Sequence, residues 1–183
     1  GCVLKCVFCQ NSVLAESKVG KPVTVSRLAE IFLELQNKGA HNINLVTPTH
    51  FVPSIRESII LSKKNGLSVP IVYNTGSYES VDTIKSLKGL VDIYLPDLKY
   101  VSSELSKKYS KAGDYFEVAR KAIDEMVRQT GTSEFDDDGI MKKGVIVRHL
   151  LLPGCLSDSK NVIKYLYDTY RDDIFISIMN QYT

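Results

Sequence analysis

The chain has 183 residues, of which 44% are hydrophobic, so it is long and apolar enough for one globular domain with a sizeable core. Its 23 basic and 21 acidic residues leave a formal charge of +2, and they are dispersed along the chain. The basic stripe of a nucleic-acid-binding protein is therefore missing. No apolar run approaches the roughly 20 residues that a membrane helix needs. We expect neither nucleic acid nor membrane as a partner.

Three of the four cysteines lie close together, at Cys2, Cys6 and Cys9, whereas the fourth is far away at Cys155. This distribution makes a poor disulfide framework. No basic segment followed by an apolar one opens the chain, as it would in a secretory signal. We predict a cytoplasmic protein whose thiols stay reduced.

Helical and strand patterns alternate along the rest of the chain. An apolar stripe with helical spacing runs through residues 25–38, and Gly39 closes it. A β-branched run at 43–47 then predicts a strand, and a helix follows over 53–65, with Pro53 in its first turn. The same signals predict further strands at 70–74, 91–95, 145–152 and 174–179, with helices at 81–87, 114–129 and 158–170.

Strands that alternate with helices of this length predict βαβ crossovers and a parallel α/β sheet with outer helices. The sheet is either open or part of a (β/α) barrel, and both place ligands at the carboxyl ends of the strands. Because the cysteine cluster starts directly after Gly1 and the strand at 174–179 has no capping element after it, we expect the first strand and the C-terminal elements to be missing.

Residues 130–143, with three consecutive aspartates at 136–138, are expected to form a long solvated loop. The segment lacks the alternating ligands and the distal Glu of a calcium-binding EF-hand loop.

The cysteine cluster has the spacing C-x₃-C-x₂-C, which can bring three thiolates together on one loop. A closed iron–sulfur cluster takes four cysteines and structural zinc usually takes four ligands. The fourth ligand is therefore Cys155, a histidine or an exogenous molecule. For Cys155 itself we favour a small buried or loop thiol.

Together with Gln10-Asn11 and the aromatic Phe8, this cluster resembles the signature of the radical S-adenosylmethionine (SAM) superfamily. The resemblance implies that Cys2, Cys6 and Cys9 hold a [4Fe–4S] cluster whose unique iron binds SAM. It also implies that Phe8 packs near the adenine. The expected fold is then a partial (β/α)₆-type barrel, with residues 1–183 as a single radical SAM core domain.

The chain is closer still to the glycyl-radical-enzyme activases, such as the pyruvate formate-lyase activating enzyme, and to a branch of putative activases. Asp97-Leu98-Lys99 resembles the family's D-L-K element, which implies that Asp97 and Lys99 hold the methionyl end of SAM. Arg148 matches an arginine that the family directs toward the cofactor. Asn74-Thr75-Gly76 resembles the family's Asp-Thr-Asn-Gly turn and adds Asn74 and Thr75 as binding residues.

Three departures from the family pattern matter. In place of a Gly-Gly-Glu element the chain has Thr47-Pro48-Thr49-His50, so hydroxyls or carbonyls of Thr47 and Thr49 would have to receive the methionyl amino group. In place of a ribose-binding histidine it has Asn180-Gln181-Tyr182, of which we select Tyr182. Asn74 in place of Asp removes a negative charge on which a bound monovalent cation in the relatives would depend.

Each residue also has a simpler structural explanation. Asp97 and Lys99 lie two apart on a strand and so share a face, which fits one ligand or a plain ion pair. Arg148 lies in an apolar strand and needs a partner, either a cofactor carboxylate, which we favour, or an acid such as Asp97. For His50 and His149 we expect hydrogen bonds rather than metal ligation, and for His41 a loop position.

The resemblance implies an enzyme that cleaves SAM reductively to a 5′-deoxyadenosyl radical and takes a hydrogen atom from a glycine of a partner protein. Flavodoxin or ferredoxin would supply the electron. Two alternatives stay open. The substrate is another peptide or a small molecule, or the cysteines hold a non-catalytic iron–sulfur centre for structure or electron transfer, with Cys155 as the fourth ligand.

Overall fold

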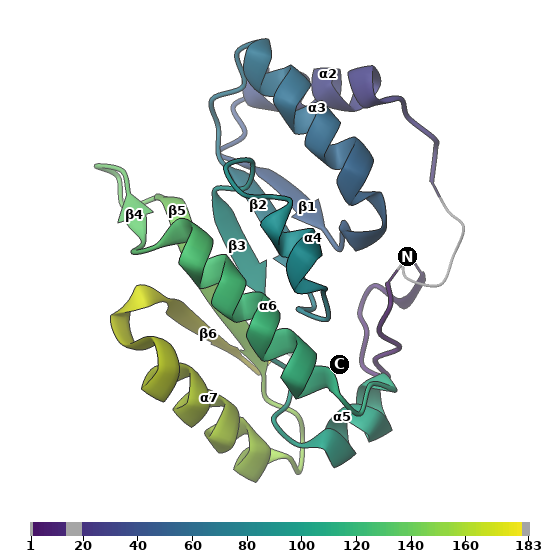
Figure 1. Ribbon diagram of the computed structural model, residues 1–183, viewed down its shortest axis with the longest axis vertical. Helices are drawn as coiled ribbons and strands as arrows, with labels where there is room; N and C mark the ends of the chain where they lie inside the picture. The colour runs from purple at the N-terminus through teal and green to yellow at the C-terminus, as the bar shows by residue number, and fades with distance from the viewer. Residues whose placement is uncertain (1, 14–19, 181–183) are drawn as a thin grey trace.

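The computed structural model describes residues 2–13 and 20–180 (Figure 1). Their six strands have the order β1-β2-β3-β5-β4, and β6 also pairs with β5. All pairs are parallel except β4 with β5. The strands are β1 (Ile43–Val46), β2 (Ile71–Thr75), β3 (Ile93–Pro96), β4 (Glu134–Phe135), β5 (Met141–Leu150) and β6 (Phe175–Met179). This is the mixed α/β fold with a mostly parallel sheet that the sequence predicts.

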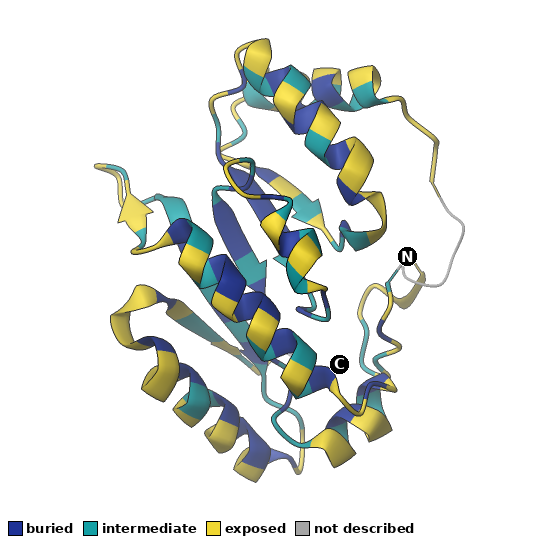
Figure 2. Cartoon of the chain, in the orientation of Figure 1, coloured by how far each residue is buried: buried dark blue, intermediate teal, exposed yellow. Residues whose placement is uncertain are grey.

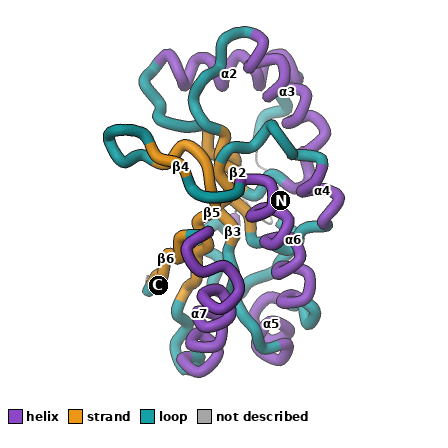
Figure 3. The backbone as a smooth tube through the Cα atoms, turned by 60° about the vertical axis from the view of Figure 1, so that its left-hand side comes forward, coloured by secondary structure: helices purple, strands orange, loops and turns teal. Residues whose placement is uncertain are grey.

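Helices follow most of the parallel strands, as βαβ crossovers require. The α-helices are α2 (Val25–Asn37), α3 (Val52–Lys64), α4 (Val81–Lys85), α5 (Ser103–Ser110), α6 (Tyr115–Thr130) and α7 (Leu156–Tyr170), with 3₁₀ turns at Thr49–Phe51 and Arg171–Asp173. Figure 3 shows the helices gathered mainly on one side of the strands.

Burial alternates along β5 and identifies the covered face of the sheet. Val145, Val147 and His149 are buried, whereas Ile146 and Arg148 between them are only half-buried. Successive side chains of a strand point to opposite faces, so the buried set faces the helices. Figure 2 shows buried and exposed residues alternating along α6, whose buried residues include Ala119, Ala122, Ile123 and Met126. The opposite, inner face of the sheet is the more accessible one.

The core lies between this covered face and the helices. Tyr73 of β2 and Tyr94 of β3 are fully buried, and their rings meet edge to face at 6.0 Å. Ile123 and Met126 of α6 are fully buried as well. Burying each such apolar side chain contributes about 1.5–3 kcal/mol, so these contacts fix the strand ends that carry the polar groups described below.

The loop after β3 is tied to α7. Asp158, in the first turn of α7, accepts hydrogen bonds from the backbone N–H groups of Val101 (3.2 Å) and Ser102 (2.8 Å). His149 of β5 makes a second tie through its Nδ1 atom, 2.8 Å from the carbonyl oxygen of Leu98. The hydrogen-bonding role predicted for His149 is confirmed, and the segment from Asp97 to Ser102 is held on two sides.

The structure corrects the sequence prediction in two places. Residues 130–143 are not a plain loop, because β4 and the start of β5 form an antiparallel hairpin. Asp136 stabilises its turn by accepting from the N–H groups of Asp138 and Ile140, and its Oδ2 atom pairs with Lys142 Nζ at 2.8 Å.

Helix α5 was not predicted. Its signals are weak, since it is serine-rich, although Ser102 caps it and Glu104 lies in its first turn.

Among the described residues, no helix is both long and apolar enough to cross a membrane.

Burial of His149 gives a prediction for stability. Burial lowers its pKa from the ordinary value, and the backbone hydrogen bond and the charges of Asp158, Asp97 and Lys99 only modify this effect. The unfolded chain therefore binds the proton more readily, so the free energy of unfolding should fall as pH drops below about 6.5.

The His149→Gln variant keeps a hydrogen-bond donor for the carbonyl of Leu98. Its free energy of unfolding, measured with urea, should fall less between pH 7.5 and 5.5 than that of the wild type. His41→Gln, which changes an exposed loop residue, is the control and should behave like the wild type. An equal pH dependence in the His149 variant would contradict the assignment.

Candidate functional site

The cysteine loop lies against the C-terminal end of α5. The backbone N–H of Val7 donates to the carbonyl of Tyr109 at 2.9 Å, and the Sγ atom of Cys6 is 3.0 Å from the hydroxyl oxygen of Ser110. The same hydroxyl is 2.9 Å from the phenol oxygen of Tyr100. Helix α5, which the sequence patterns did not predict, therefore contacts the cysteine loop and holds it in place.

The three clustered cysteines are close enough to influence one another's charge. Burial raises the pKa of the Cys6 thiol, the charge of Lys99 partly lowers it again, and Cys2 and Cys9 raise it further. Within residues 2–13 and 20–180, however, no three His, Cys, Asp or Glu side chains converge closely enough to hold a metal ion. Cys155 is buried at the start of α7, as expected for a small packed thiol.

One carboxylate, Asp97 at the end of β3, binds two cations. Its Oδ2 atom accepts from Lys99 Nζ at 2.6 Å, and its Oδ1 atom accepts from Arg148 Nε at 2.8 Å and lies 2.7 Å from Arg148 Nη2 in an ion pair. Arg148 Nη2 also donates to Asn74 Oδ1 at 2.7 Å. Asp97 is thus the acid partner of Arg148 in this structure. Since two positive groups share one negative group, the cluster carries an excess positive charge.

Lys99 connects this cluster to the cysteine loop. Its Nζ atom lies 5.9 Å from the ring centroid of Phe8, and the Phe8 ring meets that of Tyr100 edge to face at 6.4 Å. Burial alone would lower the pKa of Lys99, but the charges of Asp97 and Cys6 raise it above the ordinary value. Lys99 therefore remains a cation between the carboxylate and the cysteines.

Tyr115, the first residue of α6, is a site residue that the sequence did not reveal. Its hydroxyl accepts from the backbone N–H of Lys99 at 3.1 Å and lies 2.8 Å from the carbonyl oxygen of Asp97 and 3.0 Å from that of Gly76. Burial raises the pKa of its phenol well above the ordinary value, so the hydroxyl keeps its proton. Its position gives no signal, because it looks like any aromatic residue of an amphipathic helix.

A second polar group lies at the adjoining strand ends. Thr49 and Thr75 each donate from Oγ1 to Oε1 of Glu79 at 2.6 Å. Thr47 follows β1 with φ 51°, and its N–H donates to the carbonyl of Asn74 at 2.7 Å. Glu79 was not selected from the sequence, because a single acidic residue in a βα loop has no distinguishing pattern there.

Most of the predicted site residues therefore belong to one contact network at the carboxyl end of the sheet. Tyr182 lies outside the described residues, and His50 is exposed, with its ring edge to face with Phe51 at 6.5 Å. The network connects Cys6, Phe8, Asp97, Lys99, Arg148, Asn74, Thr47, Thr75, Glu79 and Thr49.

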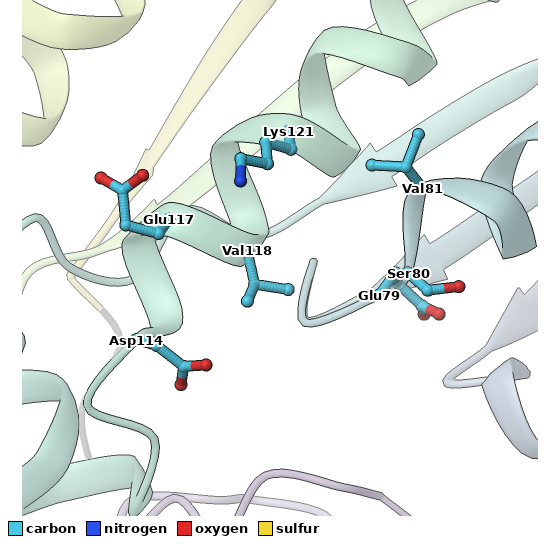
Figure 4. Close-up of a pocket in the computed structure, with 7 residues that line it drawn as sticks. All are labelled: Glu79, Ser80, Val81, Asp114, Glu117, Val118 and Lys121. Atoms are coloured by element: carbon cyan, nitrogen blue, oxygen red, sulfur yellow. The ribbon is translucent and has the colours of Figure 1, made fainter.

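A separate cavity of about 360 Å³ lies between the start of α4 and the N-terminal half of α6 (Figure 4). It touches the network only through Glu79. Its lining comprises Glu79, Ser80, Val81, Asp114, Glu117, Val118 and Lys121.

The shared carboxylate gives a prediction for stability. Asp97→Asn should lower the free energy of unfolding by about 2 kcal/mol, because it leaves two largely buried cations without their counter-charge. Asp168→Asn, which removes an exposed pair with Lys164, is the matched control and should cause no measurable change. Urea unfolding measures both variants, and equal stability of the two would refute the role given to Asp97.

Comparison with known proteins agrees with this architecture. The chain is 28% identical over 191 aligned residues to Uncharacterized protein MJ0674 of Methanocaldococcus jannaschii. The alignment covers 100% of this chain and 51% of that protein. The chain thus spans about half the length of this curated relative.

Three solved structures share the fold, each covering 98% of this chain at a TM-score of 0.60. Two are crystal structures of Streptococcus suis SuiB, bound to S-adenosylmethionine (11% identity) and to precursor peptide SuiA (10%); this chain covers 37% of each. The third is HydG, a maturase of the [FeFe]-hydrogenase, with 14% identity and 41% of its chain covered.

The family model "Radical SAM superfamily" matches residues 1–135, which is most of the chain. Membership implies radical chemistry that uses SAM and a [4Fe–4S] cluster. The chain belongs to the radical SAM superfamily.

Proposed function

We propose that residues 1–183 form the core domain of a radical SAM enzyme that activates a partner protein by removing a hydrogen atom from a glycine. The main support is that the cysteine loop, Lys99 and Arg148 lie together at the carboxyl end of a parallel sheet. This is where α/β folds bind ligands.

The cysteines fit a [4Fe–4S] cluster by their chemistry. Thiolates are the usual ligands of iron–sulfur centres, and Cys2 and Cys9 are close enough to Cys6 to influence its pKa. Three thiol ligands leave one iron open for SAM. The bound cluster would supply the electron for reductive cleavage of SAM. Each thiolate of a [4Fe–4S] cluster binds its own iron, so the three sulfur atoms need not converge on a single metal ion.

Arg148 and Lys99 are suited to hold the carboxylate of SAM. The Nε and Nη2 atoms of Arg148 are engaged by Asp97 and Asn74, whereas Nη1 makes no hydrogen bond within the described part of the chain. Guanidinium N–H groups can only donate, so Nη1 is ready for an anionic acceptor. Phe8, half-buried beside Tyr100, offers an aromatic face for the adenine.

The inner face of the sheet supports a polypeptide substrate. Asn44 and Val46 of β1 are exposed on it, and Ile146 and Leu150 of β5 are half-buried. An accessible, partly apolar face beside the site can receive an extended segment. A second candidate, favoured by the fold shared with SuiB, whose structure includes a precursor peptide, is modification of a peptide other than a glycyl radical enzyme.

Anaerobic reconstitution with iron and sulfide, followed by dithionite and SAM, tests the chemistry. We expect 5′-deoxyadenosine from the wild type and none above background from Cys6→Ala. Cys155→Ser is the matched control and should retain both the full cluster and the product, because the proposal assigns the cluster to the three cysteines of the loop and Cys155 is a buried thiol at the start of α7.

The substrate is tested by adding a candidate glycyl radical enzyme and recording an EPR spectrum. A glycyl radical that depends on SAM and Cys6 supports the activase proposal. SAM cleavage without this radical, but with a modified peptide, would favour the second candidate. A cluster that is lost in Cys155→Ser would instead favour the non-catalytic iron–sulfur protein.

The surface beside the cysteine loop supports an acidic electron donor, such as a flavodoxin or ferredoxin. The loop's exposed Lys5 lies beside the end of α5, where Lys107, Lys108 and Lys111 are also exposed. Val7, on the same loop, is 66% exposed. Lysines near the C-terminus of α5 stabilise the helix dipole, but this effect does not explain Lys5, which belongs to the cysteine loop. Basic groups around an apolar centre attract an acidic protein.

Charge reversal tests this surface. The double variant Lys107→Glu/Lys108→Glu should slow donor-dependent SAM cleavage at least tenfold at low salt, while cleavage driven by dithionite stays near the wild-type rate. Lys160→Glu/Lys164→Glu on the exposed part of α7 is the matched control. If the wild type and both double variants cleave SAM at equal rates with the donor protein, this docking surface is excluded.

A further inference from the structure

Two buried hydroxyl groups form a hydrogen-bonded chain that ends at Cys6. The Sγ atom of Cys6 is 3.0 Å from the hydroxyl oxygen of Ser110, the last residue of α5, and that oxygen is 2.9 Å from the phenol oxygen of Tyr100. Ser110 and Tyr100 are each only 1% exposed. Within the described part of the chain, neither hydroxyl has any other hydrogen-bond partner. Both groups are therefore committed to Cys6.

The backbone of the cysteine loop is held in place without this chain. The N–H of Lys5 donates to the carbonyl of Ser110 at 3.4 Å, and the N–H of Val7 donates to the carbonyl of Tyr109 at 2.9 Å. The last carbonyls of a helix lack partners within the helix, and here the loop supplies them. Figure 1 shows the loop, in purple, next to α5. Because backbone bonds lie on both sides of Cys6, its side-chain contact with Ser110 is not needed to place the loop.

Iron binding would fix the direction of both hydrogen bonds. A cysteine binds iron as a thiolate, which carries no proton and can only accept. The single hydroxyl proton of Ser110 must then point to Cys6, and the Ser110 oxygen must accept from Tyr100. Burial raises the pKa of the Tyr100 phenol above its ordinary value, so the phenol keeps the proton that it donates. The chain of donors thus runs from Tyr100 through Ser110 to Cys6.

Aromatic packing holds the phenol at the start of this chain. The ring of Tyr100 meets the rings of Phe8 and Tyr115 edge to face, at 6.4 Å and 5.7 Å. These contacts fix the ring and so keep its hydroxyl directed at Ser110. A hydroxyl that accepts one hydrogen bond is polarised and donates the next one more strongly. Tyr100 therefore acts on Cys6 through Ser110.

We propose that Ser110 is a positioning residue for electron transfer: supported by Tyr100, it donates a hydrogen bond to the Cys6 thiolate and thereby raises the reduction potential of the [4Fe–4S] cluster. Hydrogen bonds to the sulfur atoms are among the factors that set this potential. Reduction adds negative charge to the cluster, so a donor at sulfur stabilises the reduced form more than the oxidised form. This inference rests on the proposed function in taking an iron–sulfur cluster as the group that Cys6 binds.

The step that this hydrogen bond affects is the transfer of one electron. A reductant, dithionite in the test below, loses the electron and the cluster gains it, while no covalent bond forms or breaks. The positive charge of Lys99, which lies near Cys6, acts in the same direction. Reduction has to precede the cleavage of SAM in the proposed reaction, so a donor at Cys6 eases the first step.

An anaerobic redox titration of the reconstituted protein, without SAM and followed by EPR, measures the midpoint potential directly. Ser110→Ala should shift the equilibrium about tenfold toward the oxidised cluster, which corresponds to a fall of about 59 mV for one electron. Tyr100→Phe should cause a smaller fall, because Ser110 still reaches Cys6. The double variant should fall no further than Ser110→Ala, since Tyr100 acts through Ser110.

Two matched controls remove buried hydroxyls that do not belong to the chain. Ser106→Ala changes the same helix at the same burial, and its hydroxyl donates to the carbonyl of Ser103. Tyr94→Phe removes a buried phenol that donates to Gln129. Both variants should keep the wild-type potential.

A Ser110→Ala protein that holds its cluster at the wild-type potential would show that the proposal is wrong. Reduced iron content at an unchanged potential would assign Ser110 a structural role and contradict the proposal equally. If Ser110→Ala does not fold, Tyr100→Phe decides, because it leaves the contact between Ser110 and Cys6 in place.

The titration also separates this inference from the proposed function. A wild type whose variants show the expected shifts, but which never cleaves SAM, would overturn the proposed function and leave this inference intact. SAM cleavage with equal potentials in all variants would do the reverse. A wild type that takes up no cluster would overturn both.

Discussion

The site depends on the carboxylate of Asp97, which holds two cations from different parts of the chain. Arg148 lies on β5 and Lys99 lies just after β3, and without a shared anion the two would repel each other in a largely buried setting. The isolated bridge between Asp97 and Arg148 extends the pairing of β3 with β5 to the very end of the sheet. The ion pair therefore fixes both the strand ends and the direction of Lys99 toward the cysteine loop.

The same strand ends connect two groups of polar side chains. Asn74 joins the Asp97 cluster, and its neighbour Thr75 joins Glu79. Adjacent residues of a strand point to opposite faces. The end of β2 thus places Asn74 with the Asp97 cluster on one face of the sheet and Thr75 with Glu79 on the other.

Much of the fold and part of the site could be predicted from the sequence. The other site residues could not, for physical reasons. Asp97, Lys99 and Arg148 stood out because charges next to buried strands need partners, and the strands and helices followed their apolar periods. Glu79, Ser110 and Tyr115 did not stand out, because their roles come from contacts across 30, 104 and 39 positions of the chain, with Thr49, Cys6 and Gly76 respectively. Helix α5 was missed because its serines favour caps and turns over helix interiors, and only packing against the cysteine loop reveals its purpose.

The cysteine loop is fixed by contacts with α5 and with the end of β2. Its backbone is bound to α5 at Val7, and Cys6 is in contact with Ser110. Gly76, at the end of β2, lies directly against it: a side-chain carbon there would come within 3.1 Å of Leu4. The loop is thus anchored at one end of the sheet. Because Lys99 lies between this loop and Asp97, it connects the cysteines to the strand ends that carry Arg148 and Asn74.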